Sequence, residues 1–504
     1  MHYVSLIVEF LRGRPAVVFW TAALGQAALW FVMPALFYSA PPNGLAQVLT
    51  VGQQFMLGSY LGPPLAFWLA ELAFRAAGSA GVYLLAQLCV VVALWALFKL
   101  GSAIVGVRHA VLAVLLMIGI STLTLQTVDF GPAILALPFW ALALLHYWRA
   151  ACEGRRGVWL LLALDLGLLL LTSASGLILL ALIVIYTLVD PRARASLRNV
   201  EPWLAVALLL FIVAPYVGWL VQRSDLAWTQ IAAFWQTAAP TAALRFVGLL
   251  ILAHIGLMVL IGLAGGWPRD RRERPPVIED RARAMRGRWF VLVFSLGPIL
   301  AALALAALIG STKPLEPVGP FVLLSGLLVI AIAGTRIKLY RERLVSFAWL
   351  GLLVLPPVII VLVLGMGPWV AASEFRVAQP ADAMGKFFAE SFQRRTGQPL
   401  RYVAGDERLA AVVAIGAPGR PSVYTVTEPA HSPWVTPERF RETGGVVVWP
   451  VTDTVGTPPA AIRDAFPGLV VEVPRVFDRP IEGRLPLLRI GWAVVRPAAT
   501  ASAQ

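Results

Sequence analysis

The sequence predicts a polytopic α-helical membrane protein with about eleven transmembrane helices and a water-soluble α/β domain at its C-terminus. Of its 504 residues, 59% are hydrophobic and only 13% are charged, whereas soluble domains carry about 25% charged residues. Apolar runs long enough to cross a bilayer recur up to Met366 and then stop. The composition beyond that point is that of a soluble domain. We therefore expect a transmembrane domain at residues 1–370 and a second domain at residues 371–504.

Each predicted span is an apolar run close to the length of about 20 residues that crosses the hydrocarbon core. No small-residue cleavage site follows the first run, so we expect an uncleaved first span. The predicted spans are residues 16–38, 80–100, 110–125, 133–148, 158–172, 176–189, 203–221, 246–265, 289–309, 321–334 and 345–366.

The basic residues predict the orientation of these spans. Cationic clusters fall in alternate loops, around Arg155, Arg194, the run from Arg269 to Arg288, and Lys338. Cytoplasmic loops of membrane proteins retain Lys and Arg, so these loops are predicted to face the cytoplasm. An odd number of spans then gives a cytoplasmic N-terminus and a periplasmic C-terminal domain in a bacterial inner membrane. The net charge of +14 is explained by this distribution, and we expect no nucleic-acid partner.

Two predicted outer segments are too apolar to be free loops. Residues 39–78 include the apolar stretch 61–69, which predicts helices lying in the outer membrane interface with Phe67 and Trp68 at headgroup level. Residues 223–241 are similar in character, because aromatic residues alternate there with polar ones. Glu71 is expected to be an acid at the membrane interface.

The C-terminal segment alternates between helical and extended patterns, which predicts a small α/β domain. Helices are expected at residues 383–395 and 406–415, and strands at 400–403, 422–426, 445–451, 468–473 and 487–495. Residues 416–419 predict a turn and not a phosphate loop, because Pro418 removes a backbone donor.

Ionisable residues inside or beside the predicted spans are the first candidates for function, because burying charge in a membrane is costly. Asp165 lies within a span and either bonds a neighbouring helix or serves a substrate or ion. His254 lies within another span and is either a hydrogen-bonded core histidine or a functional residue. Asp129 lies at the outer mouth of the fourth span, where it acts as a base, holds a cation or caps the following helix. No metal-ligand cluster stands out, so no metal ligand is predicted and a divalent cation is left open.

Several short motifs resemble the bacterial GT-C glycosyltransferases of family 39, which include relatives of protein mannosyltransferases and of the lipid A aminoarabinose transferase. The motifs are residues 36–42 and 58–69, Asp129-Phe130, residues 137–142, Thr172-Ser173-Ala174 and Tyr402-Val403-Ala404-Gly405-Asp406. Together they extend over most of the chain.

The resemblance implies a GT-C fold and a reaction at the outer membrane face. Such enzymes take a sugar from a polyprenyl-phosphate carrier, invert its anomeric centre and pass it to a lipid, glycan or protein acceptor. An acid in the first loop acts as the base, cations stabilise the leaving phosphate, and the lipid tail lies between spans among membrane lipids.

Three of these motifs depart from the family pattern, two in the first loop and one after the fifth span. An aspartate is usual where this chain has Ser39, Lys-His where it has Leu61-Gly62, and Thr-Lys-Tyr where it has Thr172-Ser173-Ala174. Two hypotheses therefore stand: a polyprenyl-phosphate-sugar glycosyltransferase with modified chemistry, and an inactive relative that binds a lipid-linked glycan or scaffolds a partner. A transporter is a third and weaker alternative.

On the enzyme hypothesis, Asp129 is the catalytic candidate. The substrate-binding candidates are the first-loop residues Tyr38, Gln53, Gln54 and Tyr60, which are expected to contact sugar or headgroup, and the outer cations Arg75, Arg223 and Lys313. Each cation is alternatively an ordinary interfacial residue.

Overall fold

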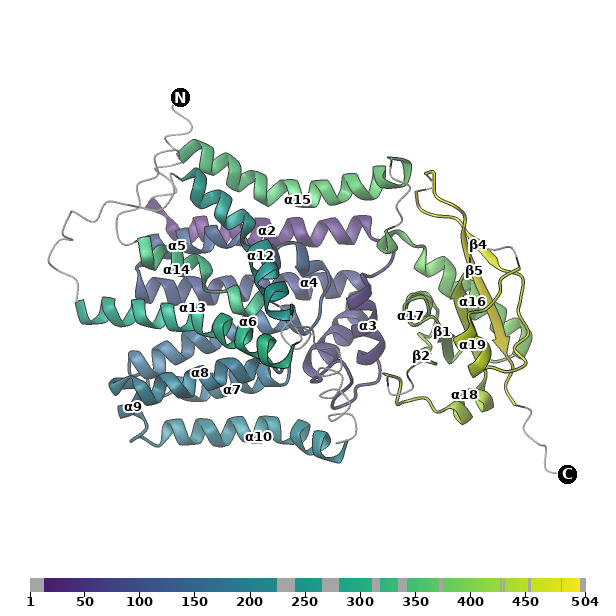
Figure 1. Cartoon of the computed structure of the whole chain (residues 1–504), viewed down its shortest axis with the longest axis horizontal. Coiled ribbons are helices and arrows are strands. Elements are labelled where there is room, and N and C mark those ends of the chain that lie inside the picture. The colour runs from purple at the N-terminus through teal and green to yellow at the C-terminus, as the bar shows by residue number, and fades with distance from the viewer. Residues whose placement is uncertain are drawn as a thin grey trace. The chain divides into compact units, whose positions relative to one another are not determined.

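The computed structural model describes residues 13–223, 241–264, 281–310, 318–333, 342–370, 375–426, 428, 431–451, 455–481 and 483–498 (Figure 1). The chain forms two compact units. Unit 1 comprises residues 1–32 and 83–357, and unit 2 comprises residues 33–82 and 358–504. The boundaries fall within three long helices, which are α2 (Pro15–Phe37), α4 (Leu65–Ile104) and α15 (Glu342–Val370).

Unit 1 is built from helices, most of them apolar along their whole length. Besides parts of α2, α4 and α15, it contains α5 (Val107–Met117), the 3-10 turns η1 (Ser121–Leu123) and η2 (Leu125–Val128), α6 (Pro132–Tyr147), the π-helical turn η3 (Trp148–Cys152), α7 (Val158–Leu170), α8 (Gly176–Val189), α9 (Pro191–Ser196), α10 (Glu201–Gln222), α12 (Ala242–Leu263), α13 (Arg281–Ile309), η5 (Gly319–Val322) and α14 (Ser325–Ala333).

These helices confirm a multi-pass membrane protein. In the described part of the chain, seven helices are long and apolar enough to cross a membrane. An eighth candidate is formed by α5 and the 3-10 segment 121–128, which are bent by 87° relative to each other, and we call residues 107–128 the bent segment. Three shorter apolar helices cover residues 158–170, 176–189 and 319–333. Every predicted span overlaps one of these helices. Large side chains such as Phe211, which is 77% exposed, face outward, as hydrocarbon solvent requires.

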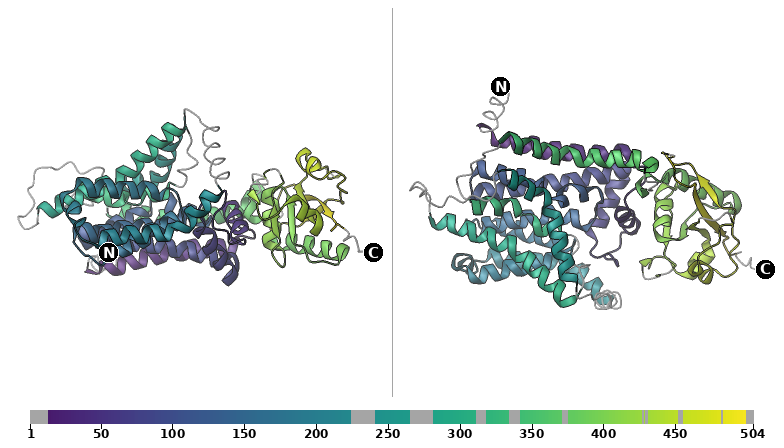
Figure 2. Two further views of the ribbon diagram at one scale, coloured as in Figure 1. Left: turned by 90° about the horizontal axis from the view of Figure 1, so that it is seen from below. Right: turned by 45° about the horizontal axis from the view of Figure 1, so that its top comes forward.

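Helix packing in unit 1 relies on aromatic and aliphatic side chains from distant parts of the sequence. The Tyr147 ring of α6 lies against Phe290 and Phe294 of α13 and Tyr186 of α8. Elsewhere, a cluster around Ile118, Leu260 and Leu353 joins the bent segment, α12 and α15, and Leu29 of α2 packs against it. Figure 2 shows α2 and α15 running side by side.

Unit 2 contains a five-stranded mixed sheet. Its strands are β1 (Tyr402–Gly405), β2 (Ser422–Tyr424), β3 (Gly445–Pro450), β4 (Arg475–Phe477) and β5 (Leu488–Val495), in the order β2-β1-β3-β5-β4. β1 is parallel to β2 and β3, whereas β5 is antiparallel to β3 and β4.

Helices cover both faces of this sheet, because successive strand residues point to opposite sides. Val446 and Val448 pack with α16 (Ala381–Thr396) and α17 (Glu407–Gly416), while Val447 and Trp449 pack with α18 (Pro437–Thr443) and α19 (Ala460–Ala465). The predicted α/β architecture of residues 371–504 is therefore confirmed.

One predicted strand is wrong. In the run 468–473, only Val471 makes an isolated bridge, to Ala493, and the edge strand β4 begins instead at Arg475. Val470 and Val473 are 73% and 84% exposed, so the valine-rich run does not contribute a buried strand face. Pro474, which lacks a backbone donor, separates the run from β4.

The outer segment, by which we mean residues 39–78, belongs to unit 2 together with the α/β elements. It contains α3 (Asn43–Gly52) and the first part of α4, which is interrupted by non-helical backbone at Ala77 and Gly78. The expectation that Phe67 lies at headgroup level is wrong, because Phe67 is 2% exposed. It is buried because α3 packs so closely on α4 that a Cβ at Gly52 would lie 2.4 Å from the Phe67 carbonyl oxygen. The predicted domain boundary at residues 370–371 stays a prediction.

Candidate functional site

Asp129 is presented by a broken membrane helix in unit 1. It directly follows η2, and its backbone N–H donates to the Gln126 carbonyl at 3.2 Å. The side chain is exposed, although Thr127 and Phe130 on either side are fully buried. The N-cap position of α6 is occupied by Gly131. The buried residues Thr127 and Phe130 thus fix the backbone that holds the Asp129 carboxylate at the surface.

Two glutamines from neighbouring helices hold the segment that leads to Asp129. Gln26 of α2 donates to the Leu123 carbonyl at 2.6 Å, and Gln87 of α4 donates to the Thr127 hydroxyl at 3.1 Å. Both amides are buried. Because 3-10 turns leave backbone groups without regular helical partners, side-chain amides replace some of those hydrogen bonds in an apolar environment.

A pair of glycines allows this segment to cross α12 at close range. The Leu257 N–H donates to the Gly119 carbonyl at 3.1 Å. A Cβ added at Gly119 would lie 2.4 Å from that nitrogen, and one at Gly256 would lie 2.7 Å from the Gly119 oxygen. The bend that positions Asp129 therefore depends on backbone-to-backbone contact between small residues.

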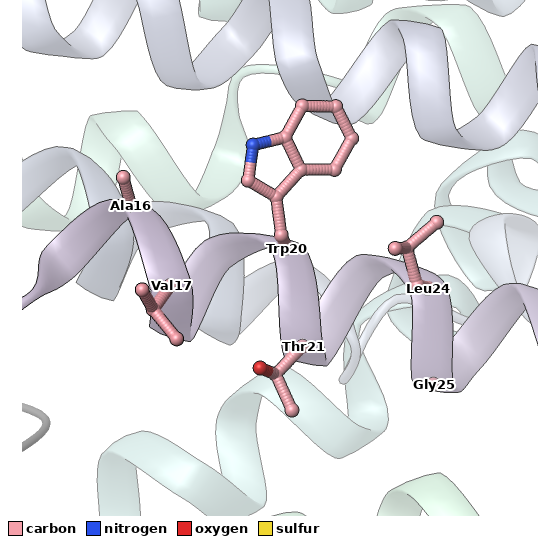
Figure 3. A pocket seen from close by; sticks show the side chains of 6 residues that line it. All are labelled: Ala16, Val17, Trp20, Thr21, Leu24 and Gly25. Atoms are coloured by element: carbon pink, nitrogen blue, oxygen red, sulfur yellow. The ribbon is translucent and has the colours of Figure 1, made fainter.

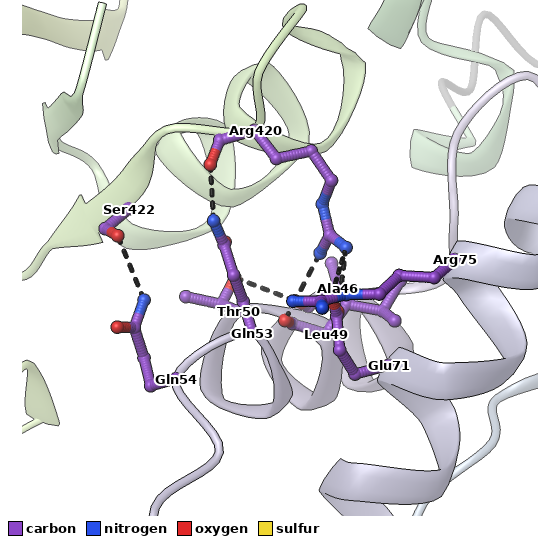
Figure 4. A network of polar contacts seen from close by, with 9 residues as sticks. All are labelled: Ala46, Leu49, Thr50, Gln53, Gln54, Glu71, Arg75, Arg420 and Ser422. Carbon is purple, nitrogen blue, oxygen red and sulfur yellow. Dashed lines mark hydrogen bonds and ion pairs between the residues drawn. The ribbon is translucent and has the colours of Figure 1, made fainter.

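In unit 2, a buried carboxylate organises the outer segment (Figure 4). Glu71 of α4 is 1% exposed, and Arg420 Nη1 contacts its Oε2 at 2.7 Å and its Oε1 at 2.9 Å. Arg75 Nε donates to the same Oε1 at 2.7 Å. The sequence-based expectation that Glu71 is an interfacial acid is wrong, because two arginines compensate its charge inside the protein.

The predicted substrate-binding glutamines also contact the turn that carries Arg420. Gln53 Nε2 donates to the Arg420 carbonyl, and Gln54 Nε2 donates to the Ser422 hydroxyl at 2.9 Å. Arg420 lies between α17 and β2 with a φ of 45°, directly after Gly419 with a φ of 80°. A non-glycine residue in this left-handed region is uncommon and costs energy.

Tyr60 lies in a second polar cluster of unit 2. Its ring stacks on the His431 imidazole with centroids 3.8 Å apart, and its hydroxyl donates to Glu407 Oε1 at 3.1 Å. Burial, followed by the neighbouring Glu407 charge, raises the pKa of the Tyr60 phenol, so the phenol stays protonated as a donor. His431 Nε2 lies 2.7 Å from Glu428. The cluster therefore joins the outer segment to α17 and His431.

The remaining predicted residues are Tyr38, Arg223 and Lys313. Tyr38 is half-buried and directly follows α2, beside Ser39, whose N–H donates to the Val377 carbonyl at 2.8 Å. Arg223 is exposed and directly follows α10 in unit 1. Lys313 and residues 224–240 lie outside the described residues. Asp129 and Arg223 belong to unit 1, whereas the outer segment belongs to unit 2.

Both intramembrane candidates are hydrogen-bonded. His146 Nδ1 of α6 and Asp165 Oδ2 of α7 are 2.5 Å apart. His254 Nε2 of α12 is 2.8 Å from the Ser325 hydroxyl, and its Nδ1 is 2.7 Å from the Leu250 carbonyl. These contacts match the helix-bonding alternative for Asp165 and the hydrogen-bonded core alternative for His254.

One open groove lies along α2 in unit 1 (Figure 3). It encloses about 560 Å³ and is lined by Ala16, Val17, Trp20, Thr21, Leu24 and Gly25. Because the side chains that line this groove are almost entirely apolar, the groove is suited to binding hydrocarbon chains. Among the described residues, no group of three or more His, Cys, Asp or Glu side chains could hold a metal ion.

Comparison with known proteins relates these features to one class of proteins. A family model described as dolichyl-phosphate-mannose-protein mannosyltransferase matches residues 62–219. ArnT from Cupriavidus metallidurans bound to undecaprenyl phosphate has a similar fold, with a TM-score of 0.50, 13% identity, and coverage of 97% of this chain and 99% of ArnT. The chain is therefore similar in sequence to this mannosyltransferase family over residues 62–219 and similar in fold to ArnT. The predicted resemblance and GT-C fold are thus confirmed.

A second protein has a similar sequence over part of the chain. The lipid A galacturonosyltransferase RgtD of Rhizobium johnstonii is 29% identical over 195 residues, which are 38% of this chain. The match spans only 41% of the length of RgtD. The family-model match includes Asp129 and Glu71, whereas Arg420 and the Tyr60 partners Glu407 and His431 lie beyond it.

Sequence reasoning missed Arg420, Glu407 and His431. Arg420 follows the predicted turn at residues 416–419, and Asp406 was expected to begin the helix that contains Glu407. Both local structures are correct, since Asp406 accepts from the Leu409 N–H and caps α17. No local pattern indicates that these residues contact positions about 350 residues earlier.

Proposed function

We propose that this GT-C protein is a membrane glycosyltransferase, which moves a sugar from a polyprenyl-phosphate carrier to a lipid, glycan or protein acceptor on the periplasmic face. The observation that carries the proposal is the ArnT-like fold over 97% of the chain, in a protein whose residues 62–219 also match the mannosyltransferase family model. ArnT has been solved with undecaprenyl phosphate, which supports a carrier of that chemical class here.

Asp129 is proposed as the base that deprotonates the acceptor hydroxyl. Its carboxylate is exposed, yet its backbone is anchored by buried Thr127 and Phe130. A positioned general base contributes about 10²–10⁴-fold to the rate. Direct attack by the deprotonated hydroxyl on the anomeric carbon breaks the sugar–phosphate bond, inverts the centre and releases polyprenyl phosphate. Cations stabilise the negative charge that develops on the leaving phosphate.

A glycolipid is the acceptor that we favour. RgtD acts on lipid A, and the apolar α2 groove suits hydrocarbon chains. A lipid-linked donor and a lipid acceptor would both reach the protein from the bilayer.

The test is mass spectrometry of envelope glycolipids from a deletion strain complemented at equal membrane protein levels. We expect wild type to restore a sugar addition that Asp129→Asn does not restore, because the amide cannot accept the proton. Asp464→Asn is the matched control, since Asp464 is an exposed acid on α19, and it should behave as wild type.

Full restoration by Asp129→Asn would show that Asp129 is not the base. An unchanged glycolipid profile after deletion would instead favour the second candidate, an inactive relative that binds a lipid-linked glycan or scaffolds a partner. That candidate is supported by Ser39 at the position of the usual acid, and by Gln53, Gln54 and Tyr60 bonding to other parts of the chain.

A further inference from the structure

Arg420 contacts three parts of the outer segment. Its guanidinium binds both oxygens of buried Glu71 and lies 3.4 Å from the Leu49 carbonyl at the end of α3. The same group lies 4.3 Å from the centre of the Phe74 ring. Its backbone carbonyl accepts from Gln53. One residue thus contacts α3, the following loop and α4.

Burial makes these contacts strong. A charge that is 1% exposed requires compensation, because an unpaired buried carboxylate loses its hydration without replacement. Arg75 supplies part of that compensation through a hydrogen bond to Oε1 of Glu71, but its side chain is 57% exposed. The Arg420 side chain is 19% exposed, so its ion pair with Glu71 is the better shielded of the two.

The backbone around Arg420 supports the same conclusion. Arg420 has a positive φ, in the left-handed region of backbone conformation that is energetically unfavourable for a non-glycine residue. Such conformations persist where the surrounding contacts hold the residue in place. A strained arginine directed at a buried carboxylate is more than an ordinary surface ion pair, which contributes little.

We infer that Arg420 is a positioning residue, which fixes the conformation of the outer segment so that Gln53, Gln54 and Tyr60 are held in place. The inference rests on the proposed function in so far as this segment meets the lipid-linked sugar. Arg420 does not touch substrate in this proposal. It acts through Glu71 and the end of α3, so its removal should affect donor binding more than chemistry.

The experiment uses the full-length protein in lipid nanodiscs, with Arg420→Ala, Arg420→Lys and the matched control Arg408→Ala. Arg408 is an exposed residue of α17 in the same unit. Amide hydrogen exchange is measured for residues 43–64 and, as an internal reference, for β1 and β3. Donor KM and kcat are measured with the polyprenyl-phosphate sugar that wild type consumes.

For Arg420→Ala we expect faster exchange confined to residues 43–64 and a higher donor KM, with kcat changed less. Displacing a binding segment by about 1 Å can lower kcat/KM by up to about 100-fold. Arg420→Lys should recover part of the loss, because it keeps the positive charge but loses the planar fork. Adding Glu71→Gln to Arg420→Ala should cause less than additive loss, since it removes the stranded carboxylate.

Wild-type exchange at residues 43–64 in Arg420→Ala would overturn the inference. Faster exchange spread equally through β1 and β3 would also overturn it, because Arg420 would then stabilise the whole domain. An unchanged donor KM despite a loosened segment would have the same consequence. If wild type transfers no sugar from any polyprenyl-phosphate donor, the proposed function fails, while the exchange comparison still decides whether Arg420 fixes the segment.

Discussion

The pair formed by His146 and Asp165 shows how single residues are accommodated in the membrane unit. Both side chains are shielded, with 13% and 8% exposed, and their nearest polar atoms are 2.5 Å apart. His146 is in the last turn of α6, where a partial negative charge favours a basic group. The pair joins α6 to α7 and explains why an apolar helix contains an aspartate.

Replacing His146 by Ala should therefore destabilise the protein. We expect the free energy of unfolding to fall by about 1–3 kcal/mol, because Asp165 would be left buried without its partner. The measurement is thermal unfolding in detergent, followed by intrinsic tryptophan fluorescence. In the double variant His146→Leu/Asp165→Leu most of the loss should be recovered, since no buried polar group remains. An unaltered unfolding curve for His146→Ala would contradict this account of the pair.

At the scale of elements, the crossing of the bent segment over α12 depends on two glycines. Gly256→Ala should destabilise unit 1 by about 1–3 kcal/mol, because its methyl group would overlap the Gly119 carbonyl. The same displacement should reduce sugar transfer, since the bent segment carries Asp129. Gly248→Ala in the same helix is the matched control, because nothing lies within 4 Å of its added Cβ.

Thermal unfolding and transfer activity of the two alanine variants decide this prediction. Gly248→Ala should be neutral or slightly stabilising, because alanine favours helix more than glycine does. Equal behaviour of the two variants would show that close approach at Gly119 is not required.

The elements that could be predicted from the sequence are those with local signals. Apolar runs located the spans, and helical spacing located α16 and α17, whose buried faces include Met384 and Val413. The valine-rich run at residues 468–473 misled the prediction, because its composition favours a strand but Pro474 and its exposure prevent a continuous one. The sequence predicted that the outer segment ends at residue 78, which is where α4 has its kink at Ala77–Gly78. It did not predict that α4 continues as a helix on both sides of the kink.

The candidate site was predicted less completely, for the same physical reason. Asp129 stood out because a carboxylate at the mouth of a span is locally conspicuous. The pairing of Glu71 with Arg420 joins residues 349 positions apart, and no local spacing reports such a contact. Glu71 therefore resembled an interfacial acid in sequence, and only packing of α3 on α4 shows why it is buried.

At the scale of the whole molecule, we predict that the C-terminal domain faces the periplasm. In a background without Cys89 and Cys152, Val473→Cys should react with a membrane-impermeant maleimide in intact cells. Val200→Cys, between α9 and α10, should react only after the membrane is permeabilised. Both positions are exposed, at 84% and 67%, so accessibility within the fold is matched. The reverse labelling pattern would invert the topology expected from the positive-inside rule.

The central claim is transfer of sugar from a polyprenyl-phosphate carrier, and reconstitution tests it most directly. Purified protein in proteoliposomes would receive isotope-labelled polyprenyl-phosphate sugars together with envelope glycolipids from the deletion strain. We predict that wild type converts one donor into polyprenyl phosphate and a labelled glycolipid with inverted anomeric configuration, and that Asp129→Asn does so at least about 100-fold more slowly. Saturable donor binding without release of polyprenyl phosphate by wild type would contradict the enzyme and identify an inactive lipid-glycan-binding relative.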